Sequence, residues 1–291
     1  MPRRVVVLVN EQKPEAVAGA EDVRALVERA GGSVVATLPA AADPLPASAR
    51  EADLFVVLGG DGTLLSQSRR CHELTTPLLG VNFGKVGFMA EFDPESLARR
   101  APAFFGEAPL PMRDLRVLEA TVTSFRDPRP RFAGIAINEA AVVAGPPYRL
   151  INVAISIDGQ LGPVVSGDGL IVASPMGSTA YNLSAGGPII APDVPALAIT
   201  PIAPHSLAFR PIVVGERSRV ELTMLRCNDA GNGQGTTLVL DGQVQAPLHP
   251  GDRVEVGMAE RTVRHVVNPD TTYWATLIGK LRWASRPAGG G

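Results

Sequence analysis

Hydrophobic positions in the first hundred residues form short continuous runs, and these runs alternate with stretches of helical period. The predicted strands are residues 4–9, 33–38, 54–58 and 78–81. The predicted helices are residues 14–30, a stretch that continues through Leu74, and residues 93–105 with Asp93 as N-cap and Pro94 in the first turn. Strands that alternate with helices are typical of a parallel sheet, so residues 1–110 are predicted to form an α/β domain.

After Pro109-Leu110-Pro111 the hydrophobic pattern changes to a period of two, which indicates strands with one buried face. The alternating segments are residues 115–124, 132–137, 151–157, 219–225 and 236–240. Turn signals lie at Asp158-Gly159, Gly231-Asn232-Gly233 and Asp241-Gly242. Residues 111–270 are therefore predicted to form a β-rich, sandwich-like domain, with one helix at residues 178–184.

A last apolar pattern at residues 272–283 predicts a helix within the segment 271–291, which ends in a Pro/Gly-rich tail. This C-terminal helix is expected to pack back on the first domain. The fold class is thus α/β for the first part of the chain and β-rich for the second.

The charge balance argues against nucleic acid as a partner. The 291 residues include 27 Lys plus Arg against 29 Asp plus Glu, a net charge of −2, so the basic footprint of a nucleic-acid-binding protein is missing. The two cysteines, Cys71 and Cys227, have no CxxC spacing, and the four histidines are scattered. These patterns predict a reduced, cytoplasmic chain in which no metal ligands can be assigned.

No segment has the pattern of a membrane span or a signal peptide. The apolar run Val5 to Val9 is shorter than a signal peptide requires, and residues 194–209 are interrupted by three prolines and His205. We expect no membrane association.

The clearest candidate for chemistry is the turn that follows the predicted strand 54–58, with the sequence Gly59-Gly60-Asp61-Gly62-Thr63. Glycines at a strand-to-helix turn let backbone N–H groups approach phosphate oxygens, and the helix N-terminus adds positive potential. A carboxylate at such a turn is a candidate general base for an attacking hydroxyl. The alternative is a plain turn in which Asp61 only caps the helix.

Two further segments carry polar groups in an apolar context. Asn138-Glu139 interrupts an apolar run and suits a ribose or an amide-bearing ring, although a solvated strand end is the alternative. Residues 167–188 are dense in Gly, Ser and Thr; there Ser178-Thr179 could cap a short helix and Tyr181 could stack on a base. A structural strand-turn-helix is the alternative for this second segment.

Taken together, these motifs resemble those of the bacterial-type NAD kinases. The matching segments are residues 59–63 (GGDGT), 82–88, 138–139 (NE), 168–184 (GDG…PxGSTAYxLS), 204–211, 241–243 (DGQ) and 277–283. The resemblance covers nearly the whole chain in order and spacing. The first motif is shared with lipid kinases, whereas the long central segment is highly specific to the NAD kinases.

The resemblance implies an N-terminal Rossmann-like α/β domain followed by a C-terminal β-rich domain. It also implies phosphoryl transfer from ATP or polyphosphate to the adenosine ribose 2′-hydroxyl of NAD, which yields NADP. Asp61 would accept the proton, and Thr63 with the N–H groups of Gly59, Gly60 and Gly62 would cradle the donor phosphates. Asp61 and Gly62 would also contact NAD. No cluster of Lys and Arg is evident near these motifs, so strict dependence on Mg²⁺ or another divalent cation is predicted.

The same resemblance implies an NAD site in the second domain. Asn138 and Glu139 would hold the adenine and ribose groups, and Asp168 would contact the nicotinamide end. The adenine side would be lined by Thr179, Ala180, Tyr181, Asn182, Leu183 and Ser184. Gln243 and Arg149 would add further contacts.

The chain departs from the family pattern at Ser166, where many bacterial members carry a basic residue. The cation for the new 2′-phosphate is therefore expected from Arg149, from Lys85 or from a neighbouring subunit, in a homodimer or homotetramer. Two other functions stay open, a lipid or polyol kinase with the same GGDGT turn and a catalytically silent NAD-sensing module.

Overall fold

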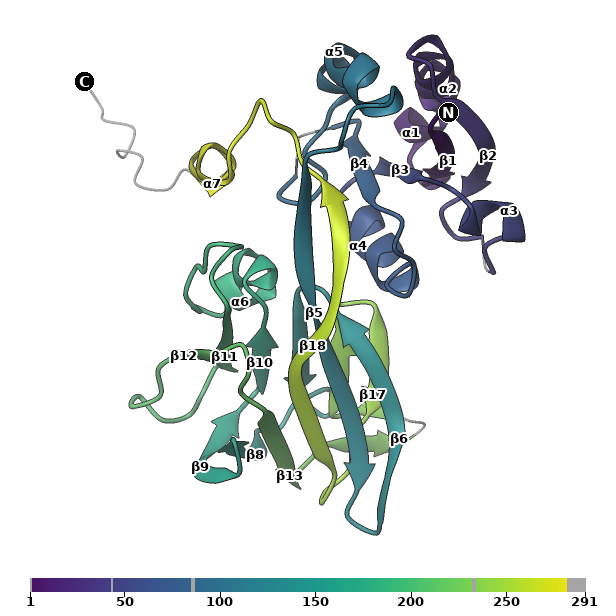
Figure 1. Cartoon of the computed structure of the whole chain (residues 1–291). Coiled ribbons are helices and arrows are strands. Elements are labelled where there is room, and N and C mark those ends of the chain that lie inside the picture. The colour runs from purple at the N-terminus through teal and green to yellow at the C-terminus, as the bar shows by residue number, and fades with distance from the viewer. Residues whose placement is uncertain (1, 43, 85–86, 232–233, 282–291) are drawn as a thin grey trace, which may run out of the picture. The chain divides into compact units, whose positions relative to one another are not determined.

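The computed structural model describes residues 2–42, 44–84, 87–231 and 234–281, and the chain divides into two compact units (Figure 1). Unit 1 comprises Met1–Asp114 and Val263–Gly291, and unit 2 comprises Leu115–Thr262. Two long strands, β5 (Met112–Ser124) and β18 (Arg253–Val266), each contribute residues to both units. Unit 2 is thus one continuous segment, whereas unit 1 is built from both ends of the chain.

Unit 1 contains a parallel sheet in the order β2-β1-β3-β4, and the end of β18 joins it where His265 pairs with Leu78. Its strands are β1 (Arg4–Val9), β2 (Ser33–Pro39), β3 (Leu54–Gly59) and β4 (Leu78–Asn82). All four lie at the predicted positions. Every residue of β3 is buried, as expected for a parallel strand with both faces covered.

The helices of unit 1 follow these strands in the predicted alternation. They are α1 (Pro14–Ala18), α2 (Ala20–Arg29), α3 (Ala47–Arg50), α4 (Asp61–Arg70), α5 (Pro94–Phe105) and α7 (Tyr273–Leu281). Asp93 caps α5 by accepting a hydrogen bond from the Ser96 backbone N–H at 2.7 Å, as predicted. The ring of Tyr273 in α7 lies 6.3 Å from the ring of Phe88, so the C-terminal helix packs on unit 1 as predicted.

Two predicted helix boundaries in unit 1 were wrong. The helix expected over residues 14–30 is interrupted at Gly19, where the Phe83 ring also occupies the space that a β-carbon would need. The helix expected to continue through Leu74 ends at Arg70, and a turn closed by the Leu74 N–H to the Cys71 carbonyl at 2.8 Å follows. The predicted end of the last helix at Trp283 lies outside the described residues, as does the tail.

His265 of β18 ties this strand to α4. Its Nε2 lies 2.7 Å from the Ser68 hydroxyl in α4, and both side chains are buried. Burial lowers the pKa of His265 to about 3, with a further contribution from Arg113, so the imidazole is neutral. The end of β18 therefore supports the helix that begins with Asp61.

Unit 2 is a β-sandwich, as predicted. One sheet has the order β9-β8-β13-β18, and β5 pairs with both β18 and β6; the other has the order β12-β11-β10-β7-β16-β17. The strands of the first sheet, besides β5 and β18, are β6 (Asp127–Ala136), β8 (Ile151–Ile157), β9 (Gln160–Gly167) and β13 (Val220–Arg226). Those of the second are β7 (Glu139–Val143), β10 (Gly169–Ala173), β11 (Ala196–Ile202), β12 (Ile212–Gly215), β16 (Thr237–Leu240) and β17 (Val244–Pro247).

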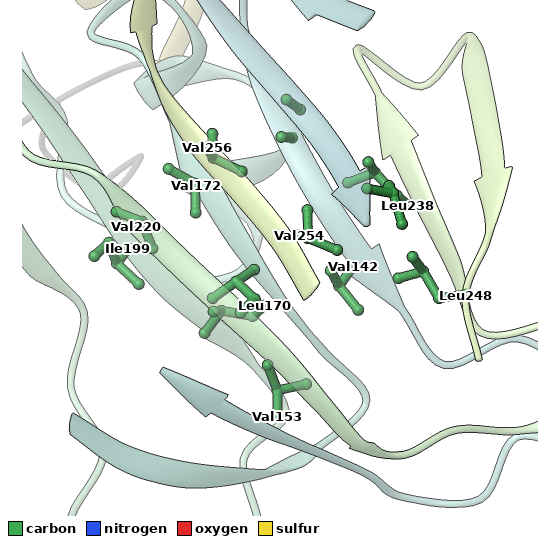
Figure 2. Close-up of a cluster of buried hydrophobic side chains, with 14 of the residues drawn as sticks. Val142, Val153, Leu170, Val172, Ile199, Val220, Leu238, Leu248, Val254 and Val256 are labelled. Carbon is green, nitrogen blue, oxygen red and sulfur yellow. The ribbon is translucent and has the colours of Figure 1, made fainter. Parts of the chain in front are cut away.

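The core of unit 2 lies between these two sheets (Figure 2). Val142 and Leu170 from the second sheet share one buried cluster with Val153, Val220 and Val254 from the first. This apolar layer removes the inward face of each strand from water, which is the main driving force for the sandwich.

The turns of unit 2 follow the sequence signals where the structure describes them. Asp158-Gly159 has φ of 53° and 76°, and Asp241-Gly242 has φ of 52° and 68°, so both are tight turns with two left-handed residues. A further small hairpin pairs β14 (Asp229–Gly231) with β15 (Gln234–Gly235), and the rest of the predicted Gly231-Asn232-Gly233 turn lies outside the described residues.

The helix predicted at residues 178–184 is instead two short pieces. A 3₁₀ helix, η1 (Met176–Thr179), and a single turn, α6 (Tyr181–Ser184), are separated by Ala180. Ser178 does not cap a helix; its hydroxyl lies 2.6 Å from the Pro175 carbonyl oxygen and accepts from the Ile190 N–H at 2.9 Å. This fully buried hydroxyl ties the two pieces to the segment that follows them.

None of the helices in the described part of the chain is long and apolar enough to span a membrane. The Cys71 and Cys227 thiols are free, and burial raises the pKa of each to about 11.

Candidate active site

The glycine-rich turn of unit 1 connects β3 to α4. Gly60 occupies the N-cap position and makes no side-chain cap, so Asp61 is the first helical residue and not the cap. A β-carbon at Gly59 would overlap the Thr63 side chain, and one at Gly60 would lie 2.8 Å from Lys13 Nζ. Nothing lies within 4 Å of the corresponding position at Gly62, which is exposed. The turn is therefore closely packed on the protein side and open beside Gly62.

The Asp61 carboxylate is held by the backbone of residues 88–90. Its Oδ2 accepts from the Phe88 N–H at 2.9 Å, and its Oδ1 accepts from the Met89 and Ala90 N–H groups at 3.3 and 2.9 Å. Gly87 is required here because a β-carbon would collide with the carboxylate. The side chain is 37% exposed. Asp61 is thus a fixed carboxylate that can still meet a substrate.

Two residues beside this turn were missed by the sequence analysis. Lys13 Nζ donates to the Gly59 carbonyl at 3.0 Å, and Asn10 Nδ2 donates to the Thr63 hydroxyl at 2.8 Å. Both follow β1, and they line a pocket of about 380 Å³ together with Gly62 and Thr63. Their position after the carboxyl end of a parallel strand, where α/β proteins bind ligands, was the available signal.

Two cations lie close to the turn, although the sequence shows no cluster of Lys and Arg near its motif. One is Lys13, and the other is Lys280 of α7, whose Nζ lies 3.9 Å from Asp61 Oδ2. Lys85, the cation considered from the sequence, lies outside the described residues. A larger pocket of about 760 Å³, lined by Arg3, Asp53 and other residues, opens at the amino ends of the strands and holds none of the predicted site residues.

In unit 2, Asp241 organises the Asn138-Glu139 segment. Its carboxylate accepts hydrogen bonds from the backbone N–H groups of Ile137 at 2.9 Å, Asn138 at 2.7 Å and Glu139 at 3.2 Å. On the other side, η1 packs directly on the Asn138 backbone, because a β-carbon at Gly177 would lie 2.6 Å from the Asn138 Cα. These contacts fix Asn138 and Glu139 at the start of β7.

Glu139 is buried with only part of its hydrogen-bonding capacity used. The residue is 6% exposed, and its Oε2 has no hydrogen-bond partner among the described residues. Burial and the nearby Asp241 raise the pKa of Glu139 to about 7, against the opposing effect of the Tyr181 N–H. A buried acceptor without a partner is costly, so this oxygen is a candidate ligand contact.

The predicted adenine-side residues differ in their accessibility. Tyr181 is 42% exposed, whereas Asn182 is fully buried. The Asn182 amide donates to the Ser178 and Pro188 carbonyls and accepts from the Thr200 hydroxyl at 2.6 Å. Both the donor and the acceptor of this side chain are therefore bonded within unit 2. The remaining members are the half-buried Thr179, Ala180 and Leu183 and the exposed Ser184.

The structure does not bring all predicted NAD-binding residues of unit 2 together. Glu139 pairs with Ala173 at one end of β10, while Asp168 precedes the other end. Because β10 has five residues, its two ends lie about 15 Å apart. Exposed Arg149 lies near the Asp168 end, since the Asn228 amide bridges the Arg149 and Ala144 carbonyls. Gln243 belongs to the opposite end, in the turn beside Glu139.

The described residues contain no group of three or more His, Cys, Asp or Glu side chains that could hold a metal ion. The carboxylates of the site are already engaged by backbone N–H groups or lie apart.

Known protein families match most of the chain. Residues 40–107 match the model of the ATP-NAD kinase N-terminal domain, and residues 137–268 match that of the ATP-NAD kinase C-terminal domain. The NAD kinase of Rhodopirellula baltica is 38% identical over 83% of this chain and 75% of its own length. The NAD kinase of Symbiobacterium thermophilum is 37% identical over 97% of this chain and 99% of its own length.

Solved structures share the fold over nearly the whole chain. A yeast NADH kinase complexed with NADH superposes with a TM-score of 0.82 at 22% identity, covering 99% of this chain and 90% of its own. An NAD kinase from Archaeoglobus fulgidus in complex with ATP has a TM-score of 0.72 at 25% identity, covering 96% of this chain and 98% of its own. With both family domains matched and relatives aligned along most of its length, the chain belongs to the NAD kinase family.

Proposed function

We propose that the chain is an NAD kinase that phosphorylates the adenosine ribose 2′-hydroxyl of NAD to give NADP, with ATP as the donor. Its curated relatives are NAD kinases, and one related structure contains ATP. The observation that carries the proposal is the Asp61 carboxylate, which three backbone N–H groups hold at the start of α4, beside a phosphate-binding type of turn.

Asp61 is proposed as the general base. When the 2′-oxygen bonds to the γ-phosphorus, the bond from that phosphorus to the bridging oxygen breaks and its electron pair leaves with ADP. The hydroxyl proton passes to Asp61. A positioned base of this kind contributes a factor of roughly 10² to 10⁴ to the rate.

The donor phosphates are proposed to bind beside Gly62 and Thr63, in the pocket that Lys13 also lines. The backbone of the turn and the N-terminus of α4 favour anions there, and Lys13 adds a full positive charge. Polyphosphate offers the same chemistry and is the alternative donor.

The acceptor is proposed to bind at the Asn138 end of β7 in unit 2. The Glu139 Oε2 can accept from a ribose hydroxyl or an amino group, and the exposed Tyr181 ring can stack on the adenine. The same region is proposed to include the other predicted contacts, which are Thr179, Ala180, Leu183, Ser184 and Gln243.

A homodimer or homotetramer is proposed as the working form. β12 is an edge strand of the second sheet, with Ile212 and Val213 about half exposed, and Leu207 nearby is 91% exposed. Light scattering of the purified protein tests the oligomeric state.

Magnesium is proposed to enter with the donor phosphates, because these would bring several negative charges beside the Asp61 carboxylate at the start of α4. Bound there, a divalent cation would screen the charge that accumulates between the donor phosphates and Asp61. Lys13 and Lys280 offset only part of that charge.

A single assay of NADP formation tests the proposal. The wild-type protein is supplied with NAD or NADH as acceptor and with ATP or polyphosphate as donor, with Mg²⁺ or with excess chelator. We expect turnover with NAD, ATP and Mg²⁺, loss of turnover in chelator, and a loss of roughly 10² to 10⁴ in kcat for Asp61→Asn with NAD affinity nearly unchanged. Turnover of Asp61→Asn near that of the wild type would reject the base assignment.

The same assay separates the two other functions. A lipid or polyol kinase would phosphorylate diacylglycerol or a sugar alcohol and leave NAD unchanged. An NAD-sensing module would bind NAD without turnover, and the intact, well-held Asp61 argues against it. The chain is proposed to act in the cytoplasm, where its free thiols stay reduced.

A further inference from the structure

The C-terminal helix α7 reaches the proposed reaction centre through one lysine. Lys280 Nζ lies 3.9 Å from Asp61 Oδ2, which is the oxygen that also accepts from the Phe88 N–H. Its side chain is 31% exposed, so the ammonium group is partly shielded from water. Among the described residues, this is the ion pair that the structure gives to Asp61.

An aromatic contact holds Lys280 in this position. Its ammonium group lies 5.2 Å from the centroid of the Phe88 ring, within the range of a cation–π interaction. Tyr273 lies two helical turns earlier on α7, on the same helix face, and its ring is 6.3 Å from that of Phe88. The Phe88 backbone thus binds Asp61 while its ring supports the lysine that faces Asp61.

The use of lysine in this chain is unusual. Of the 27 basic residues, three are lysines and twenty-four are arginines. Two of the three lie at the same turn: Lys13 at the Gly59-Gly60 backbone and Lys280 at the Asp61 carboxylate. An ammonium is a compact point charge, whereas a guanidinium is a planar fork. The chain uses the compact cation at the one turn where a phosphoryl group is proposed to move.

We propose that Lys280 is a positioning residue of the phosphoryl-transfer centre: it holds Asp61 Oδ2 in place from α7 and balances negative charge as the phosphoryl group arrives beside that carboxylate. This inference rests on the proposed kinase function. It makes the C-terminal helix part of the reaction centre.

Substitution of Lys280 tests the proposal in the full-length protein. Lys280→Met keeps the aliphatic stem against Phe88 and removes the charge. Because the charge matters during transfer and not for initial binding, we expect kcat to fall by about 10- to 100-fold, with the KM values for NAD and ATP changed less than about threefold. Lys280→Arg restores the charge with a different shape, so its kcat should lie between that of Lys280→Met and that of the wild type.

Controls separate a local effect from loss of the fold. Arg99→Gln removes another exposed cation of unit 1, one that pairs with Glu95 at 2.7 Å, and should leave both kcat and KM unchanged. Phe88→Leu keeps the backbone N–H to Asp61 and removes the ring, so it should lower kcat in the same direction as Lys280→Met but less. Thermal unfolding of each variant should match the wild type within a few degrees.

The outcomes distinguish this inference from the proposed function. If wild-type protein makes NADP, Asp61→Asn does not, and Lys280→Met retains at least half of the wild-type kcat, the role of Lys280 is wrong and the kinase function stands. A rise in KM alone, or Lys280→Arg no better than Lys280→Met, also rejects it. If the wild-type protein makes no NADP, the proposed function itself fails.

Discussion

The carboxylates of the candidate site are stabilised in two different ways. Asp61 and Asp241 each accept hydrogen bonds from three backbone N–H groups. Glu139, in contrast, is 6% exposed and has an oxygen without a partner among the described residues. The protein therefore compensates the charge of the first two, whereas a charge on Glu139 must be compensated by a ligand or removed by a proton.

The burial of Glu139 predicts a pH-dependent stability in the absence of ligand. Because its folded-state pKa of about 7 exceeds the ordinary value of 4.5, the folded protein binds more protons than the unfolded chain between these pH values. This group therefore makes the free energy of unfolding fall as pH rises from about 4.5 to 7. Glu139→Gln should be more stable than the wild type at pH 8, by up to about 3 kcal/mol, and similar to it near pH 4.5.

Urea unfolding at several pH values measures this difference. Glu95→Gln provides the control, because Glu95 has a side chain that is 85% exposed in a surface ion pair and should change stability little at any pH. A constant difference between Glu139→Gln and the wild type from pH 5 to 8 would argue against a shifted carboxyl group.

Donor and acceptor binding should separate at the level of single side chains. Lys13→Met removes the cation beside Gly59 and should raise the KM for ATP about 10- to 100-fold, with the KM for NAD nearly unchanged. Tyr181→Ala removes the exposed ring and should raise the KM for NAD about 5- to 100-fold, with the KM for ATP nearly unchanged. The two variants are controls for each other. If either variant raised the KM values for both ATP and NAD, the proposed separation of donor and acceptor binding would be contradicted.

Sequence reasoning could single out Asp61, Asn138 and Glu139 as candidates because each is an uncommon polar residue at an abrupt end of an apolar run. It could not find Lys13 or Lys280 as neighbours of the turn. Lys13 is 46 positions from Gly59 in sequence, and Lys280 lies on a helix at the other end of the chain. Such contacts depend on tertiary packing that local pattern does not encode.

At the scale of elements, the strands of unit 1 were predictable because each short apolar run is bounded by turn residues. Strands such as β10 and β11 in unit 2 were harder, since nearly all their residues are buried and show no alternation. The predicted helix ends near Gly19 and Arg70 were wrong, and the break at Ala180 was not predicted. Positions of this kind involve particular tertiary contacts. One is the Phe83 ring on Gly19, and another is the Ser178 hydroxyl on Ile190.

The turn between β16 and β17 is predicted to be a positioning element for the Asn138-Glu139 segment. Asp241→Asn keeps the left-handed backbone but replaces a carboxylate by an amide, so hydrogen bonds to three N–H groups weaken. Hydrogen bonds to charged groups contribute roughly 1.5–3 kcal/mol each, so we expect a lower unfolding temperature and a KM for NAD raised at least about tenfold.

Asp158 offers a matched control for this substitution. It has a similar left-handed conformation, with φ of 53°, and its carboxylate accepts one backbone hydrogen bond, from Arg219 at 2.8 Å. Asp158→Asn should lower stability slightly and leave the KM for NAD unchanged. Equal effects of the two substitutions on KM would show that the Asp241 turn has no special relation to the NAD site.

At the scale of the whole molecule, unit 2 is a continuous insertion into unit 1. Its two sheets enclose one apolar cluster that includes residues from every part of the segment. A protein comprising residues 115–262 should therefore fold alone, with cooperative thermal unfolding and β-type circular dichroism. A fragment of residues 1–114 lacks the end of β18 and α7 and should be far less stable. Non-cooperative unfolding of the 115–262 fragment would contradict this prediction.

The position of His265 has a consequence for how the chain matures on the ribosome. His265 pairs with Leu78 of β4 and contacts Ser68 of α4, the helix that begins with Asp61. All of unit 2 precedes residue 265 in the chain, so it is synthesised before this support for α4 becomes available. Domains can fold during translation, so unit 2 can fold at that stage. The synthesis of unit 2 is thus complete while α4, which carries the proposed base Asp61, still lacks its contact with His265. A nascent protein arrested before residue 263 would carry the segment proposed to bind NAD without a finished phosphoryl-transfer centre.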